Sequence, residues 1–396
     1  MPFTLCRIGP LFATILALVA TLWTAACQPT VTTGPLAGGG GATPGGAVPV
    51  ALLVPRGSGD PKEDQLARDL EDAARLAIAD LSGTGVDLRV YGTAGQTGQA
   101  ATAARNAVQD GARIILGPLR AEEANAAAIA IRGRGRGVNV LAFSNNPTIA
   151  GGNLFILGQT FGDTARRLAR FATLQGKRRA VAVHATDTSG QMGVQAIESA
   201  MAEAGASLAG RVGYDFSQDA VVAAVPRIVR VAEENAADAL FFTANTAGAL
   251  PILTQMLAER GLDNEAVQYI GLTRWDLPPQ TLDLPGVQGG WFAVPDPLRA
   301  AAFEARFEAA NGRRPHALAG LAYDGIAAVG ALVSRGGPRA LSRGDLTQPA
   351  GFEGVNGIFR LLPDGTNDRG LAVATIRDRK VEVIDPAPRS FGGAGL

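Results

Sequence analysis

The chain has 396 residues, 47% of them hydrophobic, with 36 lysines and arginines that balance 36 aspartates and glutamates. This length can build two or three domains, each with a sizeable hydrophobic core. Because binding to a phosphate backbone draws on an excess of positive charge, the balance excludes nucleic acid as the expected partner.

The N-terminus has the pattern of a secretory signal peptide over residues 1–26. An apolar run at 11–23 follows Arg7 and is too short for a membrane-spanning helix of the mature chain. Small residues directly before Cys27 make this segment resemble a bacterial lipobox. The resemblance implies that cleavage leaves Cys27 as a lipidated first residue; the alternative is a cleavage site beside a buried cysteine. We therefore expect a lipid-anchored protein of the cell envelope that faces the periplasm.

Residues 27–48 are rich in glycine, proline and threonine. Such a composition buries too little apolar surface to fold, so it predicts a flexible tether between the lipid anchor and the folded body. The other cysteine, Cys6, leaves with the signal peptide, so the mature body has no free thiol once Cys27 is lipidated.

Alternating strand and helix patterns fill residues 50–143. The run at 50–54 is apolar at every position, which is typical of a strand covered on both faces of a parallel sheet. The periodicity then predicts helices at 66–81, 100–110 and 121–132, and strands at 88–91, 113–116 and 139–143. After the last of these helices, Arg132, Arg134 and Arg136 alternate with glycines and predict a solvated turn rather than a binding patch.

The same alternation restarts after residue 160. Helices are expected at 164–174, 194–204, 220–235, 250–260, 298–311 and 317–334, and strands at 180–184, 239–242 and 267–271. Repeated βα units of this kind predict α/β architecture with two doubly wound sheets. The tail differs, because strand patterns at 354–360, 369–377 and 380–384 surround a Pro-Asp-Gly turn and predict a terminal antiparallel hairpin.

Several short segments, in their order and spacing, resemble the type I periplasmic binding proteins of the leucine-binding family over residues 49–385. They are VALLVP at 50–55, IILGPL at 114–119, VLAFSN at 140–145, GNLFILG at 152–158, GGWFAVP at 289–295, YDGI at 323–326 and GVNGIFR at 354–360. Within that superfamily, LGPL at 116–119 together with LAFSNN at 141–146 looks closest to the penicillin-binding-protein activator lipoproteins, which act on peptidoglycan synthases.

The resemblance implies a type I periplasmic binding protein fold, in which two doubly wound parallel-sheet lobes are joined by three crossovers. We expect the crossovers near 157–159, 293–296 and 335–352. Lobe one is then expected to hold residues 49–157 and 296–335, and lobe two residues 158–295 and 336–390. Ligands of such sheets bind outside the carboxyl ends of the strands, often over helix N-termini.

The candidate ligand contacts in lobe one are polar residues that follow strands. Ser144, Asn145 and Asn146 come after the strand at 139–143 and could present hydroxyl and amide groups to a carboxylate or a sugar. The alternative is an Asx turn before Pro147. Arg120 either clamps an anion or is a solvated residue at the start of a helix.

The candidates in lobe two are Asp187, Asn245, Thr273 and Trp275. Asp187 fits a helix cap at least as well as a ligand contact. Trp275 either stacks on a sugar or apolar ligand or packs as a rim aromatic on the neighbouring prolines.

Two positions depart from the pattern of amino-acid binders in this family. Arg120 stands where a serine or threonine usually holds the α-carboxylate, and Thr273 stands nearest to the place of an acidic residue that neutralises the ammonium group. Asp276 could substitute if its loop bends suitably. A buried cation without a counter-charge is costly, so these departures argue against a free amino acid as ligand.

The sequence predicts a binding protein that is not an enzyme and uses no cofactor. With two histidines and no HExxH, CxxC, Walker A or GxSxG motif, it has no recognisable metal site or pair of nucleophile and base. The favoured hypothesis is a penicillin-binding-protein activator that contacts a peptidoglycan synthase. The alternative is a substrate-binding protein that delivers amino acids or related small solutes to an ABC permease.

The residue after Cys27 is Gln28, and by resemblance to enteric sorting rules this favours the outer membrane. Both hypotheses leave room for a small-molecule ligand in the cleft, and neither involves nucleic acid.

Overall fold

A computed structural model describes residues 46–81, 85–133 and 137–392. The expected signal peptide, Cys27 and nearly all of the expected tether lie outside these residues. Gly46–Leu396 forms one compact unit, and all four hydrophobic clusters lie inside it. No helix in the described ranges is long and apolar enough to cross a membrane.

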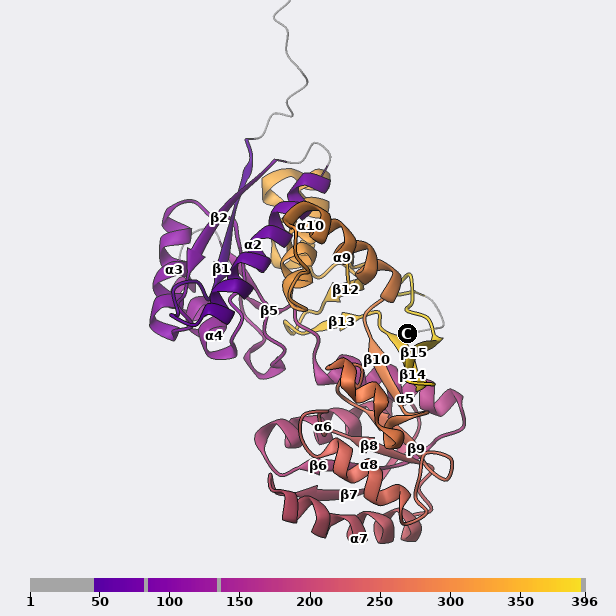
Figure 1. Ribbon diagram of the computed structural model, residues 1–396. Helices are drawn as coiled ribbons and strands as arrows, with labels where there is room; N and C mark the ends of the chain where they lie inside the picture. The colour runs from indigo at the N-terminus through magenta and orange to yellow at the C-terminus, as the bar shows by residue number, and fades with distance from the viewer. Residues whose placement is uncertain (1–45, 82–84, 134–136, 393–396) are drawn as a thin grey trace, which may run out of the picture. The chain divides into compact units, whose positions relative to one another are not determined.

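The first sheet is parallel, with the strand order β2-β1-β3-β4-β5 (Figure 1). Its strands are β1 (Val48–Val54), β2 (Val86–Gly92), β3 (Ile114–Leu116), β4 (Asn139–Ala142) and β5 (Leu154–Ile156). The apolar run in β1 is buried on both faces, as expected from the sequence. Val50 and Leu52 face one hydrophobic cluster, and Ala51 and Leu53 face another.

Helices cover both faces of this sheet. The helices are α2 (Pro61–Asp80), α3 (Thr97–Gln109), α4 (Ala121–Ile131) and α10 (Ala319–Gly336). The buried side chains of α2 and α10 join the cluster of Val50 and Leu52, while those of α3 and α4 join the cluster of Ala51 and Leu53. Figure 1 shows the two pairs of helices on opposite sides of β1.

The second sheet has the order β15-β14-β10-β9-β8-β6-β7. Its strands are β6 (Arg179–Ala185), β7 (Ser207–Tyr214), β8 (Ala239–Phe242), β9 (Gln268–Gly271), β10 (Trp291–Val294), β14 (Ala372–Arg377) and β15 (Lys380–Asp385). All neighbours are parallel except the β10–β14 and β14–β15 pairs, so an antiparallel hairpin forms one edge of this sheet. The Pro-Asp-Gly turn at 363–365, which was expected in the terminal hairpin, instead joins the strands Gly357–Leu361 and Asn367–Arg369.

Helices again cover both faces of the second sheet. They are α5 (Phe161–Leu174), α6 (Thr188–Glu203), α7 (Gln218–Glu234) and α8 (Leu250–Ala258). Val181 and Val183 of β6 face the cluster of α7 and α8, and Ala180 and Ala182 face the cluster of α5 and α6.

A small third sheet corrects the expected division of the chain. Its strands are β11 (Phe352–Gly354), β12 (Gly357–Leu361) and β13 (Asn367–Arg369), and the neighbouring helices are α9 (Pro297–Asn311) and α11 (Arg343–Leu346). Leu346, Phe352 and Phe359 lie in the core of lobe one, whereas Leu371 lies in a core of lobe two. The assignment of residues from 336 onward to lobe two was therefore wrong for the residues of the third sheet, which belong to lobe one. The third crossover follows β13, near residue 370, because the apolar side chains of β11 and β12 pack on α10.

Candidate functional site

A cavity of about 700 Å³ lies at the carboxyl ends of β3, β4 and β5. Because parallel strands end along one edge of their sheet, the segments after these strands meet there. The cavity is also lined from lobe two and from the crossovers. Its lining residues are Leu119, Arg120, Ala121, Glu122, Phe143, Ser144, Asn145, Asn146, Gly158, Gln159, Arg274, Leu277, Pro295, Ala317, Leu318, Leu321, Asn356, Arg369 and Leu371.

The three polar residues after β4 all lie at this cavity, and their role as ligand contacts stays a prediction. Ser144 is buried, and its Oγ accepts a hydrogen bond of 3.1 Å from the backbone N–H of Asn146. The side-chain oxygen of Asn146 accepts from the backbone N–H of Thr148 at 2.9 Å, so the alternative Asx turn is also present. Asn145 is exposed. The local turn thus holds Ser144 and Asn146 in place and leaves the Asn145 amide facing solvent.

Arg120 lies at the cavity but already has a charged partner. Its Nη2 donates to the carboxylate of Glu63, and its Nη1 donates to the carbonyl oxygen of Gly95 at 2.9 Å. Glu123, on the first turn of α4, accepts a hydrogen bond of 2.6 Å from Thr93 Oγ1. Burial raises the pKa of the Glu123 carboxyl. Arg120 therefore lies beside the cavity, and the carboxylate of Glu63 on α2 balances its positive charge.

The two other arginines of the cavity are balanced in the same way. Arg274 donates from Nε to Asp276 Oδ1 at 2.9 Å and from Nη2 to the second carboxylate oxygen. Because Arg274 pairs with both oxygens, the charge of the Asp276 carboxylate is already balanced and offers no net negative charge to a ligand ammonium group. Among the described lining residues, Glu122 is the carboxylate that remains.

Arg369 connects the cavity to the crossovers. Its Nη1 donates to Asp324 Oδ2 at 3.1 Å, and its Nε donates to the carbonyl oxygen of Leu157 at 3.1 Å. Asp324 lies on α10, Leu157 on the first crossover and Arg369 at the end of β13, directly before the third crossover. Burial raises the pKa of the Asp324 carboxyl, and the Arg369 guanidinium opposes that shift. The arrangement fixes the wall of the cavity where the lobes join.

Three expected contacts of lobe two do not line the cavity. Asp187 is the N-cap of α6, where its Oδ1 accepts from the backbone N–H of Gly190 at 2.7 Å. Thr273 Oγ1 donates to the carbonyl oxygen of Ala244 at 3.1 Å. Asn245 is exposed in the loop after β8. Their role in ligand binding stays a prediction. The hydrogen bond of Asp187 caps α6, and that of Thr273 joins two loops of lobe two.

The expectation that Trp275 stacks on a ligand is wrong. Its side chain has 0% exposed surface and packs between Phe242 and Phe292, with ring centroids 6.2 and 6.4 Å away. Two glycines make room for the indole, because a Cβ on Gly271 or Gly290 would come within 2.3 or 2.2 Å of it. A ring enclosed on all sides has no face to offer a solute.

Sequence reasoning missed several residues of the cavity. Gln159 follows β5, and the segment GNLFILG was available as a signal although no strand was predicted in it. Asn356, in the turn between β11 and β12, lies in the segment GVNGIFR, but only the packing of the third sheet on α10 brings it to the cavity. Among the described residues, no group of three or more histidines, cysteines or carboxylates could hold a metal ion.

Comparison with known proteins defines the class of this fold. Residues 47–380 match the family model described as periplasmic binding protein. The chain therefore belongs to the periplasmic binding protein family, a family of binding proteins and not of enzymes. No curated protein gives a significant sequence match.

Solved structures share the fold at low sequence identity. A proposed branched-chain amino acid ABC transporter from Rhodospirillum rubrum is 21% identical with a TM-score of 0.72, and the alignment covers 85% of this chain and 100% of that one. An ABC transporter substrate-binding protein from Desulfitobacterium hafniense, in complex with Leu, is 19% identical with a TM-score of 0.62 over 85% and 100% of the chains.

A third similar structure, a solute-binding protein of an ABC transporter from R. palustris in complex with benzoate, is 17% identical with a TM-score of 0.58 over 89% and 99% of the chains. These matches show a shared fold. The closer resemblance to the activator lipoproteins stays a prediction.

Proposed function

We propose that this protein is the solute receptor of an ABC importer, and that it binds a small carboxylate with an apolar body in the cavity of about 700 Å³. The position of this cavity at the carboxyl ends of β3, β4 and β5 is the observation that carries the proposal. Its volume lies in the usual range for a site that encloses a small ligand. The similar structures are mostly transporter substrate-binding proteins, which favours this hypothesis over the activator.

The walls of the cavity fit a solute that is apolar over most of its surface. Phe143, Leu277, Leu318 and Leu321 supply apolar contacts. Asn145, Gln159 and Asn356 supply amide groups, and the N–H groups of Arg274 that Asp276 does not occupy supply charge-assisted donors. A carboxylate accepts from such donors without bringing a positive charge into the site.

The cavity offers little to an ammonium group. Asp276 is held by Arg274, and Thr273 is neutral and bonded to Ala244. Glu122 is exposed. Burying an ammonium without a paired carboxylate is costly, so a carboxylate without an amino group fits better than an amino acid.

The test is a thermal-shift screen of residues 28–396 with acids in matched pairs. 4-Methylpentanoate is leucine without its amino group, and 3-phenylpropanoate is phenylalanine without its amino group; benzoate is a fifth probe. A ligand at a hundred times its Kd adds about 2.7 kcal/mol of stability, which is a rise of a few degrees in Tm. We expect at least one of the three simple carboxylates to raise the Tm and its amino-acid partner to leave it unchanged.

A rise in Tm with leucine or phenylalanine that exceeds the rise with the matching acid would contradict the proposed ligand class. No rise with any of the five probes would count against a carboxylate receptor.

The second candidate is regulation of a peptidoglycan synthase from the outer membrane. The run LAFSNN at 141–146, which resembles the activator lipoproteins, and Gln28 after Cys27 favour it. In both cases we propose lipid attachment at Cys27 and a periplasm-facing body. Mass spectrometry of the protein recovered from envelope membranes tests the acylation of Cys27. A pull-down from the same membranes tests the partner, since a synthase without permease subunits would favour the regulator.

A further inference from the structure

A second cavity, of about 690 Å³, lies at the opposite edge of the first sheet from the solute cavity. It is lined by the segments that precede β3, β4 and β5, at Arg113, Asn139 and Asn153, and by the segment 339–343. Since the strands are parallel, their amino ends share this edge. The cavity thus lies apart from the residues proposed to hold the solute.

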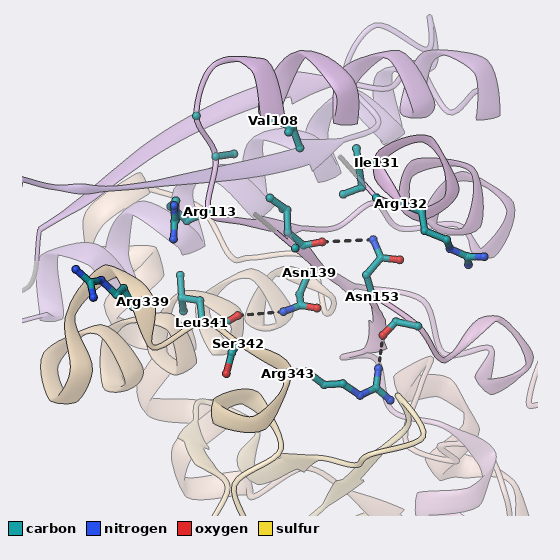
Figure 2. A pocket seen from close by; sticks show the side chains of 16 residues that line it. Val108, Arg113, Ile131, Arg132, Asn139, Asn153, Arg339, Leu341, Ser342 and Arg343 are labelled. Atoms are coloured by element: carbon teal, nitrogen blue, oxygen red, sulfur yellow. Dashed lines mark hydrogen bonds between the residues drawn. The ribbon is translucent and has the colours of Figure 1, made fainter. Parts of the chain in front are cut away.

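Four arginines from separate segments line this cavity: Arg113, Arg132, Arg339 and Arg343. Figure 2 shows Arg113 and Arg339 on one side of it and Arg132 on the other. The described lining residues include no aspartate or glutamate. In an otherwise neutral chain, this is a local excess of positive charge.

These four arginines also lack carboxylate partners, in contrast to the three arginines of the solute cavity. Within the described ranges, none of the four takes part in an ion pair. Arg343 donates only to the carbonyl oxygens of Gly152 and Pro363 and lies over the Phe155 ring.

The carboxylates nearest along the chain have other partners. Asp110 accepts a hydrogen bond from Tyr91 Oη at 2.8 Å, and Asp345 accepts one from the backbone N–H of Ser342 at 3.1 Å. The guanidinium groups therefore remain available to an external anion. The planar donor fork of arginine matches the oxygens of a phosphate group.

The cavity lies beside the point where the chain enters the folded body. The backbone N–H of Arg113 donates at 2.9 Å to the carbonyl oxygen of Pro49, the second residue of strand β1. The tether expected from the sequence over residues 27–48 lies almost wholly outside the described residues; a flexible coil of ~21 residues would span about 25 Å. With lipid at Cys27, this edge of the sheet is within reach of the headgroups of the membrane.

We propose that this cavity, named here the arginine pocket, binds the phosphate group of an anionic phospholipid and holds the tethered body against the membrane surface. The proposal rests on the proposed membrane attachment for its orientation, while the site itself is independent of the solute cavity. Val108, a partly buried apolar residue of the lining, suits the first methylenes of the lipid.

The test measures co-sedimentation of residues 28–396 with vesicles. This part contains the whole compact unit and has no acyl chains to insert, so binding reports the protein surface. One set of vesicles is phosphatidylcholine alone, and the other contains phosphatidylglycerol as a third of the lipid. We expect binding to the anionic vesicles only, weakened by salt and by millimolar inorganic phosphate.

The key variant is Arg113→Gln with Arg339→Gln. Each basic residue near an anionic surface contributes about fivefold in affinity, so we expect binding about 25-fold weaker. The matched control is Arg178→Gln with Arg260→Gln, which removes the same charge from exposed positions of lobe two. The control should bind within twofold of the wild type, and both variants should keep the wild-type Tm.

Equal binding by both double variants, or equal binding to both kinds of vesicle, would overturn the proposal. A Tm raised by inorganic phosphate without any vesicle binding would overturn the lipid as the source of the phosphate group. Because the thermal shift with carboxylates is measured separately, failure here leaves the proposed solute receptor intact.

Discussion

Arg369 and Asp324 form an ion pair whose side chains are 3% and 0% exposed. Asp324 also accepts from the backbone N–H of Val355 at 2.8 Å, and Asn367 donates to the carbonyl oxygens of Ile156 and Gly158 at 2.8 and 2.9 Å. These contacts join α10 to the first and third crossovers. A buried pair with satisfied partners contributes little net stability, but removal of one member leaves the other charge unpaired.

We expect Arg369→Met to lower the free energy of unfolding by about 3–5 kcal/mol, because it leaves the Asp324 carboxylate buried without a counter-charge. Urea unfolding of residues 28–396 measures the change. The control is Arg360→Met, which breaks a more exposed pair with Asp368 and should cost at most about 1 kcal/mol. If Asp324→Asn restores none of the stability of Arg369→Met, the unpaired charge is not the cause.

Asp163, in the first turn of α5, should make the free energy of unfolding depend on pH. Burial raises its pKa to about 6, against the pull of Arg166 and the hydrogen bonds from Thr160. The folded state therefore holds a proton on Asp163 between about pH 4 and 6, where the unfolded chain has lost it. The contribution of this group to stability falls as the pH rises through that range.

We expect the free energy of unfolding of the wild type, relative to Asp163→Asn, to fall by about 2 kcal/mol between pH 4 and pH 7. Asparagine keeps an oxygen that can accept from the N–H of Thr160, so the variant removes mainly the charge. Urea unfolding of both proteins at the two pH values measures the difference. Parallel stabilities across the range would show that Asp163 is ionised at little cost in the folded state.

At the scale of single elements, a close contact between a helix and a strand fixes where α6 begins beside the second sheet. The first turn of α6 packs against the end of β6, where a Cβ on Gly190 would lie 2.0 Å from the carbonyl oxygen of Ala185. Gly98, in the first turn of α3, has nothing within 4 Å of its Cβ position. The two glycines are in similar helical positions and differ in the space around them.

We expect Gly98→Ala to stabilise the protein by about 0.5–1 kcal/mol, since alanine favours the helix. Gly190→Ala should destabilise it by about 1–3 kcal/mol, because the helix must move away from β6. Thermal or urea unfolding of both variants measures the contrast. A similar change in the free energy of unfolding of both variants would mean that the contact with Ala185 does not determine the effect of Gly190→Ala.

The sequence was enough to predict elements whose side chains show a clear period. The run in β1 is apolar at every position because two helical layers cover it. β7 was missed, since it is an edge strand with glycines and the exposed Arg211 in place of a continuous apolar run. The third sheet was assigned to the wrong lobe, because its sequence pattern indicates that the side chains are buried but not which core they join.

The same limit applies to the candidate site. Ser144, Asn145 and Asn146 were predicted at the cavity because residues after parallel strands share an edge. Trp275 was assigned to the site from its loop position, but Gly271 and Gly290 open a space in the core that only the packed structure shows. Position after a strand was a useful guide in the first sheet, whereas Asp187, Asn245 and Thr273, which follow strands of the second sheet, do not line the cavity.

At the scale of the whole molecule, the two edges of the first sheet carry different chemistry. The carboxyl edge has arginines that are each paired with a carboxylate, beside amides and apolar walls. The amino edge has the arginine pocket, next to the start of β1. The two edges therefore suit the two ligands proposed for them, a small carboxylate at the carboxyl edge and a phosphate group at the amino edge.

The central claim is that a small carboxylate binds in the cavity beside Asn145. Titration calorimetry with benzoate, or with whichever simple carboxylate gives the largest thermal shift, tests it in Asn145→Asp and Asn245→Asp. Both changes add one negative charge at an exposed loop residue, but only Asn145 lines the cavity. The account predicts binding at least about tenfold weaker in Asn145→Asp, from like-charge repulsion, and unchanged in Asn245→Asp. Equal affinity in both variants, or a larger loss in Asn245→Asp, would contradict it.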